Sequence, residues 1–394
     1  MALHNTNEAY GSVARTFHWL TALLILTAIP LGLIASRMPY DTAEQLASKA
    51  QLFSVHKTIG VAAFLIALSR ILWTLFERHL AHLHPERRLE TVLAALVHWA
   101  LYISMLMVPL TGWIGHAATT GFAPILWPFG QGLPFVPQSP RFALVFETLH
   151  WAFTKILIAS VILHVLGAIK HAVVDRDDTM ARMTTGRVSP LAPARKPGRG
   201  PMLVAVLIYI AGAGLAWSVI PPAEESAPAL EAVASDWKVT EGTLAIGVKQ
   251  MGQDVGGSFA DWTAAISFDE TPVGGKNGRV TVTIATDSLT LGSVTSQAKG
   301  DGFFDTKNHP TATFEADILP DGATYRAEGT LTLRGTAVPV TLPFTLALDD
   351  NRATMHGETT LDRRAFGIGA AFPDEQSVGF PVTVTVDLTA ERQE

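Results

Sequence analysis

Two histidines interrupt one long apolar segment, residues 149–171, where paired imidazoles could bind metal. His150 and His164 lie fourteen residues apart. On a helix this spacing is about 21 Å along the axis and leaves the side chains within roughly 40° of one face. Polar groups inside a membrane are costly and usually face a partner or a cofactor. Either histidine alone is explained equally well by a hydrogen bond to a neighbouring helix, but the pair predicts two ligand positions stacked along one helix.

The composition limits what these histidines could hold. The chain has 394 residues, 48% of them hydrophobic, and a net charge of −6, with a mean hydropathy of +0.28. It is too apolar for an ordinary soluble enzyme of this size. The absence of cysteine excludes disulfides, thiolate-bound metals, iron–sulfur clusters and covalent c-type haem. Any haem must therefore be held non-covalently, by histidine or methionine.

Five apolar segments are each long enough to cross a bilayer, and we expect all five to be helices. They cover residues 15–34, 53–76, 92–115, 144–174 and 202–220. Arginines concentrate between the second and third spans and between the fourth and fifth, which predicts that these segments and the N-terminus are cytoplasmic. The N-terminal stretch is interpreted as the lead-in to an uncleaved span. The sequence thus predicts a multi-pass inner-membrane protein whose residues after Ile220 are periplasmic.

This topology places four histidines at two depths. His18 begins the first span on the cytoplasmic side, and His56 begins the second span on the outer side. The fourth span enters from outside, so His150 lies at the level of His56, and His164 lies at the level of His18. The pattern predicts two bis-imidazole haem sites. Six-coordinate iron of this kind has no open position and would carry electrons rather than bind oxygen.

The third span contains a competing pair. His98 and His116 lie eighteen residues apart, also on one helical face. Pro109 and nearby glycines make a straight face less favourable, and His116 falls near the aqueous boundary. We therefore expect His98 to lie beside a ligand or at a quinone site, and His116 to be structural.

Further residues of the spans have candidate roles. Gly60 could let a macrocycle approach its helix, although close helix packing explains it equally. Arg70 could pair with a haem propionate, and snorkelling is the alternative. Lys170 and His171, at the inner end of the fourth span, are candidates for a quinone or proton-uptake site. Three loop histidines could bind metal, although solvation explains them better: His79, His82 and His84.

The ordered motifs of residues 8–185 resemble the bacterial cytochrome b561 family of four-helix di-haem b membrane proteins. These motifs are R-x-x-H-W from Arg15, H-K-x-x-G from His56, H-W-x-x-Y from His98, P-L-x-G from Pro109 and H-x13-H from His150, followed by Lys170 and His171. The resemblance implies two haem b groups per chain, bound at His18, His56, His150 and His164, with Arg15 at the cofactor site. It also implies electron transfer between ubiquinone and a second partner, which in some members is superoxide.

Beyond a linker the pattern changes from helical to alternating. Apolar residues alternate with threonines or charged residues, which predicts many antiparallel strands with one apolar and one solvated face. Examples are Val280, Val282 and Ile284; Val340, Leu342 and Phe344; and Val382, Val384 and Val386. A barrel of this kind can enclose one apolar ligand. No arrangement of side chains suggests hydrolysis, so binding is expected rather than catalysis.

Residues 237–388 resemble the YceI family of periplasmic lipocalin-like barrels that hold isoprenoid lipids. The motifs are V-G-G-S-F (255–259), G-F-F-D-x-x-x-x-P (302–310), G-T-L-T-L-R-G (329–335) and D-R-x-x-F-G-I (362–368). The first strand reads TLAIGVKQ, without the His-Ser often found there. The predicted lipid pocket, whose members could equally be ordinary core, is Leu331, Leu333, Leu342 and Phe344.

The predicted fold is multi-domain: an all-α transmembrane four-helix di-haem bundle with a fifth transmembrane helix, then an all-β antiparallel lipocalin-like barrel. The expected boundaries are 1–180 for the bundle, 181–200 for a cytoplasmic linker, 201–220 for the fifth helix, 221–235 for a periplasmic linker and 236–394 for the barrel. We expect electron exchange with the quinone pool and isoprenoid or quinone binding, with no nucleic acid partner. The alternatives are a lipid-binding or lipid-sensing protein anchored by its haem bundle, and a purely structural role.

Overall fold

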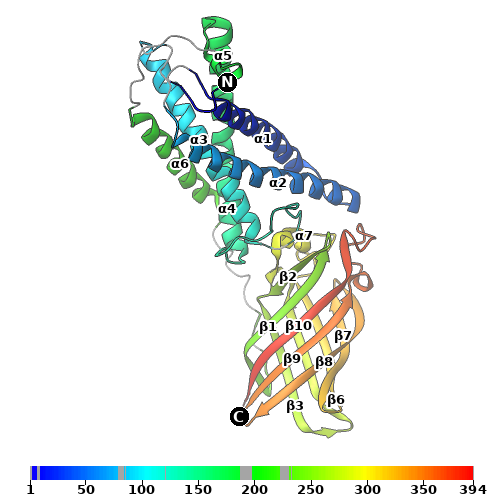
Figure 1. Cartoon of the computed structure of the whole chain (residues 1–394). Coiled ribbons are helices and arrows are strands. Elements are labelled where there is room, and N and C mark those ends of the chain that lie inside the picture. Colours follow the sequence, from blue (N-terminus) through cyan, green and yellow to red (C-terminus); the bar gives the residue numbers. More distant parts are fainter. Residues whose placement is uncertain are drawn as a thin grey trace. The chain divides into compact units, whose positions relative to one another are not determined.

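The protein forms two compact units, one helical and one built from a β-sheet (Figure 1). The computed structural model describes residues 2–6, 9–78, 84, 86–119, 121–186, 198–221, 230–231 and 233–393. The predicted loop histidines His79 and His82 lie outside the described residues.

Five helices of the first unit are long and apolar enough to cross a membrane, which confirms the five predicted spans. Their large apolar side chains are widely exposed; Leu23 and Leu26, for example, are 64% and 57% exposed. This is expected of helices that face lipid and satisfy their backbone internally. The helices are α1 (Ser12–Arg37), α2 (Ala43–Thr74), α3 (Arg88–Ala117), α4 (Pro140–Ile169) and α6 (Gly200–Val219).

The fourth span has a defined start and an irregular end. Ser139 caps α4 by accepting a hydrogen bond from the backbone N–H of Phe142, and Pro140 occupies the first turn, where its missing N–H costs nothing. At its other end α4 continues as the π-helix η1 (Lys170–Asp175), which stops at Arg176 in the left-handed conformation. The short helix α5 (Thr179–Thr184) follows. Single π-turns of this kind are frequent at functional sites.

The closest helix packing involves α3, α4 and α6. Tyr209 of α6 is buried against Phe153 of α4, with ring centroids 5.0 Å apart, and its hydroxyl forms a hydrogen bond with Ser104 of α3. Helices α1 and α2 approach α4 less closely. Space therefore remains between α4 and the first two helices, where the candidate histidines lie.

The second unit is one antiparallel ten-stranded sheet that curls into a barrel (Figure 1). Its hydrogen-bonded order is β3-β4-β6-β7-β8-β9-β10-β1-β2-β5. The long strands are β1 (Trp237–Gln250), β2 (Gln253–Phe259), β3 (Trp262–Val273), β4 (Lys276–Ala285), β6 (Thr311–Asp321), β7 (Thr324–Leu333), β8 (Thr336–Asp349), β9 (Arg352–Asp362) and β10 (Val378–Arg392). The short elements are η2 (Thr286–Ser288), β5 (Leu289–Leu291), η3 (Gly292–Val294), α7 (Thr295–Lys299) and η4 (Arg363–Phe366). The predicted all-β antiparallel architecture is confirmed.

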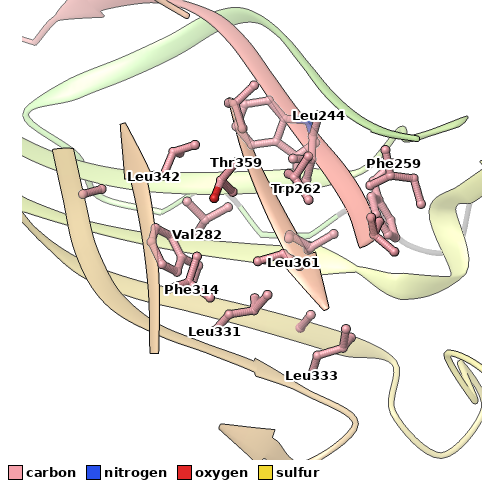
Figure 2. Close-up of a pocket in the computed structure, with 18 of the residues that line it drawn as sticks. Leu244, Phe259, Trp262, Val282, Phe314, Leu331, Leu333, Leu342, Thr359 and Leu361 are labelled. Atoms are coloured by element: carbon pink, nitrogen blue, oxygen red, sulfur yellow. The ribbon is translucent and has the colours of Figure 1, made fainter. Parts of the chain in front are cut away.

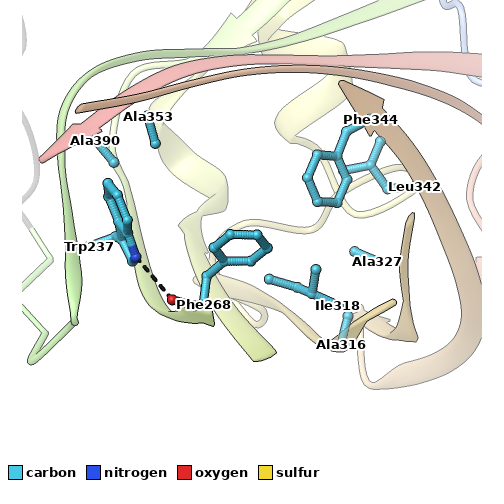
Figure 3. Close-up of a cluster of buried hydrophobic side chains, with 9 residues drawn as sticks. All are labelled: Trp237, Phe268, Ala316, Ile318, Ala327, Leu342, Phe344, Ala353 and Ala390. Atoms are coloured by element: carbon cyan, nitrogen blue, oxygen red, sulfur yellow. Dashed lines mark hydrogen bonds between the residues drawn. The ribbon is translucent and has the colours of Figure 1, made fainter. Parts of the chain in front are cut away.

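Strand alternation decides what faces the barrel interior. Val280, Val282 and Ile284 of β4 all line the interior cavity, as the period of two requires. At the end where β1 starts, a buried cluster packs around the cavity (Figure 3). Within it the indole N–H of Trp237 donates to the carbonyl of Phe268 at 3.2 Å. This end of the barrel therefore has a well-packed core whose indole donor is satisfied.

The segment between β9 and β10 is held by a single buried arginine. Arg363 is 4% exposed, and its guanidinium donates to five backbone carbonyls at 2.5–3.0 Å. The acceptors are Gly379, Ile368, Gly369, Phe372 and Val378. Because a guanidinium has five N–H donors, all of them are used within the fold.

We expect Arg363→Met to destabilise this part of the barrel by about 3–5 kcal/mol, because five buried carbonyls lose their donor together. Hydrogen exchange of the full chain measures this as faster exchange of the amides of residues 364–379. The matched control is Arg364→Met, which removes an exposed pair with Asp362 and should cost less than about 1 kcal/mol. Equal protection in both variants would contradict the assignment.

Candidate functional sites

The structure brings four of the predicted histidines together in two pairs. The ring centroids of His18 on α1 and His164 on α4 are 6.1 Å apart. Those of His56 on α2 and His150 on α4 are 6.2 Å apart. These are the two pairings predicted by depth. A single helix, α4, contributes one histidine to each pair.

The separation within each pair fits one metal ion between two imidazoles. A histidine nitrogen binds a metal at about 2.0–2.1 Å, and the ring centroid lies about 1.1 Å behind that nitrogen, so two rings on opposite sides of one ion have centroids about 6.3 Å apart. The observed 6.1 and 6.2 Å match this value. The residues present therefore fit two bis-histidine haems.

His98 on α3 is the competing histidine, and it lies beside the first pair. Its ring centroid is 5.2 Å from that of His164, about 1 Å less than the separation within either pair. This distance fits ring-to-ring contact better than shared coordination. His116 forms a separate contact with the Nζ of Lys57 at 3.2 Å, and its other nitrogen lies 3.1 Å from the Oε1 of Gln131.

The rings of the His56–His150 pair are each oriented by a backbone carbonyl. The Nδ1 of His56 is 2.9 Å from the carbonyl of Ala28, and the Nδ1 of His150 is 2.8 Å from that of Val108. A proton held on Nδ1 by such an acceptor leaves Nε2 free for a metal and raises its basicity. The Nε2 atoms of His56 and His150 are therefore available as metal ligands.

Two glycines allow these rings to approach the neighbouring helices. A Cβ on Gly32 of α1 would lie 2.7 Å from the Cε1 of His56, and a Cβ on Gly112 of α3 would lie 2.9 Å from the Nδ1 of His150. Each glycine follows its ring's carbonyl acceptor by four residues, one helical turn. The sequence analysis did not assign this role to either glycine. A signal was present: both are helical glycines, which need a packing reason.

Space for a large group surrounds the second pair. A cavity of about 240 Å³ is lined by both His56 and His150, and also by Gly32, Gly60 and Lys155. A Cβ on Gly60 would meet no atom within 4 Å, and the same is true of Gly167. Open space beside Gly60 fits the prediction that a macrocycle lies against this helix. That role stays a prediction.

The predicted cofactor arginines lie in different surroundings. Arg15 donates to the carbonyl of Thr184 at 3.0 Å and so contacts α5. The guanidinium carbon of Arg70 lies 5.7 Å from the ring centroid of Tyr102, and no carboxylate of the described residues lies within 4 Å of its nitrogens. The charge of Arg70 is therefore available for an acidic group such as a propionate. Lys155 instead contacts the Trp151 ring at 5.5 Å.

Lys170 and His171 belong to an ion-paired network at the end of α4. The Nζ of Lys170 lies 2.7 Å from an oxygen of Asp175 and 3.1 Å from one of Glu90. The Nδ1 of His171 lies 2.7 Å from an oxygen of Asp177. The π-turn of η1 and the left-handed Arg176 place Asp175 and Asp177 within reach, which the regular helical pattern of the sequence did not predict.

Asp177 is the centre of this network outside the span. Burial raises its pKa, but hydrogen bonds from Thr179 and His171 outweigh burial and lower the pKa of Asp177 to about 2. Its carboxylate also lies 3.1 Å from the Nε2 of His84. His171, Asp175 and Asp177 could together surround a cation, although Lys170 already lies against Asp175.

The barrel encloses an apolar cavity of about 280 Å³ (Figure 2). Figure 2 shows side chains such as Phe314 and Val282 projecting into a common space from different strands. The four residues predicted as a lipid pocket all line it: Leu331, Leu333, Leu342 and Phe344. Leu342 and Phe344 also belong to the buried cluster of Figure 3. Their contact with a lipid stays a prediction.

Comparison with known proteins assigns each unit separately. Residues 9–186 match the family model of prokaryotic cytochrome b561, and residues 237–390 match that of the YceI-like domain. The chain is similar to cytochrome b561 homolog 2 of Escherichia coli (strain K12), with 25% identity over 184 residues, covering 46% of this chain and 95% of that protein.

Two solved structures are similar to the second part of the chain. Burkholderia cenocepacia BcnA is 30% identical, with a TM-score of 0.37, and the match covers 39% of this chain and 99% of that one. The Campylobacter jejuni YCEI protein is 17% identical, with a TM-score of 0.31, and the match covers 44% of this chain and 99% of that one.

Proposed function

Because residues 9–186 belong to the prokaryotic cytochrome b561 family and residues 237–390 form a YceI-like domain, we propose that this membrane electron-transfer protein links the quinone pool to a second redox partner. It would bind two haem b groups, at His18 and His164 and at His56 and His150. The observation that carries the proposal is the spacing of these rings, 6.1 and 6.2 Å between centroids. A bis-histidine haem b supplies one-electron transfer and leaves no position for oxygen.

The backbone and side chains around the histidines then have distinct tasks. The carbonyls of Ala28 and Val108 orient His56 and His150. Arg70 would neutralise a propionate, and Gly60 would leave room for the macrocycle. Mutual ring contact makes His98 a positioning residue for His164.

We place the ubiquinone site at the His171 end of α4. Asp177 accepts from the Nδ1 of His171, so Nε2 is left for a quinone oxygen. The adjacent Lys170 would supply positive charge, which its ion pairs with Asp175 and Glu90 partly neutralise. A carboxylate, an imidazole and an ammonium in one network can also exchange protons with water during quinone turnover.

The barrel would hold an isoprenoid lipid, the quinone itself or a related prenyl compound. The support is its apolar cavity of about 280 Å³, which suits a hydrocarbon tail rather than a polar substrate. A tethered carrier of this kind would present or store the lipid beside the membrane.

Reduction of the haems tests this function. We expect ubiquinol or superoxide to reduce the haems of the purified full chain within seconds. The reduction is measured as the absorbance change of b-type haem. His171→Ala should slow reduction by quinol at least tenfold, while leaving haem content unchanged. Haems inert to both reductants, in a protein that binds prenyl lipids tightly, would favour the alternative of a lipid-binding protein anchored by its bundle.

The orientation of the chain is a separate proposal. Basic residues between the second and third spans, such as Arg87 and Arg88, would hold that segment in the cytoplasm, and five spans would then leave the barrel in the periplasm. We expect alkaline phosphatase fused after Glu394 to be active and a fluorescent protein that folds only in the cytoplasm to be dark. An inactive phosphatase fusion together with a bright fluorescent fusion would show that the orientation is the reverse of the one proposed.

A further inference from the structure

One polar side chain breaks the apolar row that β1 presents to the barrel cavity. Leu244, Ile246, Val248 and Gln250 all line the cavity, as alternate residues of one strand do. Gln250 is 4% exposed, so it is as buried as its apolar neighbours. A buried amide in an apolar row costs stability unless it is hydrogen-bonded.

The side-chain oxygen of Gln250 has no hydrogen-bond partner among the described residues. Two other polar side chains that line the cavity are satisfied within the fold. The hydroxyl of Thr359 donates to the carbonyl of Thr341 at 3.0 Å, and the indole of Trp237 donates to Phe268. Buried polar groups in native proteins normally have a partner, so the free acceptor of Gln250 indicates that a ligand supplies one.

Arg363 also lines the cavity, but its guanidinium is already hydrogen-bonded within the fold. Gln250 pairs with Val378 across the β1–β10 ladder, and Arg363 donates to the carbonyl of that same Val378 at 3.0 Å. All five donors of Arg363 are bound to backbone carbonyls. This end of the cavity therefore offers a neutral acceptor and no free cationic donor from Arg363, which does not favour a phosphate.

We infer that the barrel selects a neutral isoprenoid whose head carries a hydroxyl, and that this hydroxyl donates to the Oε1 of Gln250. The inference rests on the proposed isoprenoid-binding role of the barrel and specifies the ligand's head group. The tail would run along the apolar row toward the packed end at Trp237, the first residue of the same strand. A prenol or a prenylated hydroquinone has this chemistry. A prenyl diphosphate is charged, and an oxidised quinone, which has acceptors only, would leave the Oε1 of Gln250 unpaired.

Binding of hydroxyl probes and of their blocked ethers tests the inference, and prior reduction of the haems with dithionite keeps electron transfer out of the measurement. The full chain in lipid nanodiscs is titrated by displacement of a fluorescent prenyl analogue, with partition measured on empty discs. The probes are geranylgeraniol, its methyl ether and its diphosphate, and a prenylated hydroquinone with its dimethyl ether. The first comparison reports on a prenol and the second on a quinol.

We expect the wild-type chain to bind at least one hydroxyl probe about tenfold more tightly than its ether, as the loss of a buried hydrogen bond predicts. Gln250→Leu, which continues the apolar row at similar volume, should bind alcohol and ether equally. Thr359→Val, the matched control, should keep the preference, because that hydroxyl is already satisfied.

The outcomes separate this inference from the proposed function. Equal binding of alcohols and ethers by wild type, tighter binding of the diphosphate, or a preference that survives Gln250→Leu would overturn the Gln250 assignment while leaving the barrel an isoprenoid carrier. Failure of every probe to bind would overturn both the carrier role and the inference.

Discussion

Replacing either histidine of α4 is expected to remove one haem and leave the other. His150→Ala should lose the haem shared with His56, and His164→Ala the haem shared with His18, because each ring is one half of a pair at about 6 Å. Each variant should fall from two haems per chain to one. The double variant should be colourless. Haem content per chain, measured as the pyridine complex of purified protein, gives the result.

His98→Ala provides the matched control, since His98 lies on a neighbouring helix and contacts the same ring at 5.2 Å. It should keep two haems and change only the environment of the one bound by His164, seen as a shifted absorbance maximum or reduction potential. Loss of a haem in His98→Ala combined with retention in His164→Ala would show that the ligand assignment is wrong.

Gly112→Val is expected to abolish the second haem site without altering a ligand. A Cβ at this position would already lie 2.9 Å from the Nδ1 of His150, and that ring cannot easily shift because its Nδ1 is bound to the carbonyl of Val108 at 2.8 Å. The variant should lose one haem of two and resemble His150→Ala. Gly32→Ala should weaken the same site through His56.

A glycine in open surroundings controls for the effect of glycine replacement itself. Gly214 lies in α6, and a Cβ there would meet nothing within 4 Å, so Gly214→Ala should keep both haems. Haem content and the absorbance spectrum of the three variants are compared at equal protein concentration. A full complement of two haems in Gly112→Val would contradict the close approach of His150 to α3.

Much of the fold follows from local patterns. Continuous apolar runs predict the five spans because a bilayer requires about twenty such residues in each helix, and period two predicts the strands. Helix direction predicts that His18 and His164 lie at the same depth, since alternate spans cross the membrane in opposite senses. The same reasoning could not choose between His98 and His18 as the partner of His164, because both can reach its level. The distances between the ring centroids make that choice.

Other features depend on tertiary contacts that no local pattern shows. The acceptor for His150 is a carbonyl forty-two residues away on another helix. The network of Lys170 and His171 depends on a π-turn that a regular helix would not form. Gln250 was visible as the last residue of TLAIGVKQ, but its missing partner is evident only once the barrel is closed around it.

We propose that one transmembrane helix, α4, holds an iron porphyrin through each of its two histidines, His150 and His164. The most direct test is the haem content and optical spectrum of the purified wild-type chain after expression with ample haem supply. We expect two non-covalent, low-spin b-type haems per chain. A colourless protein, or one that saturates at a single haem, would contradict it.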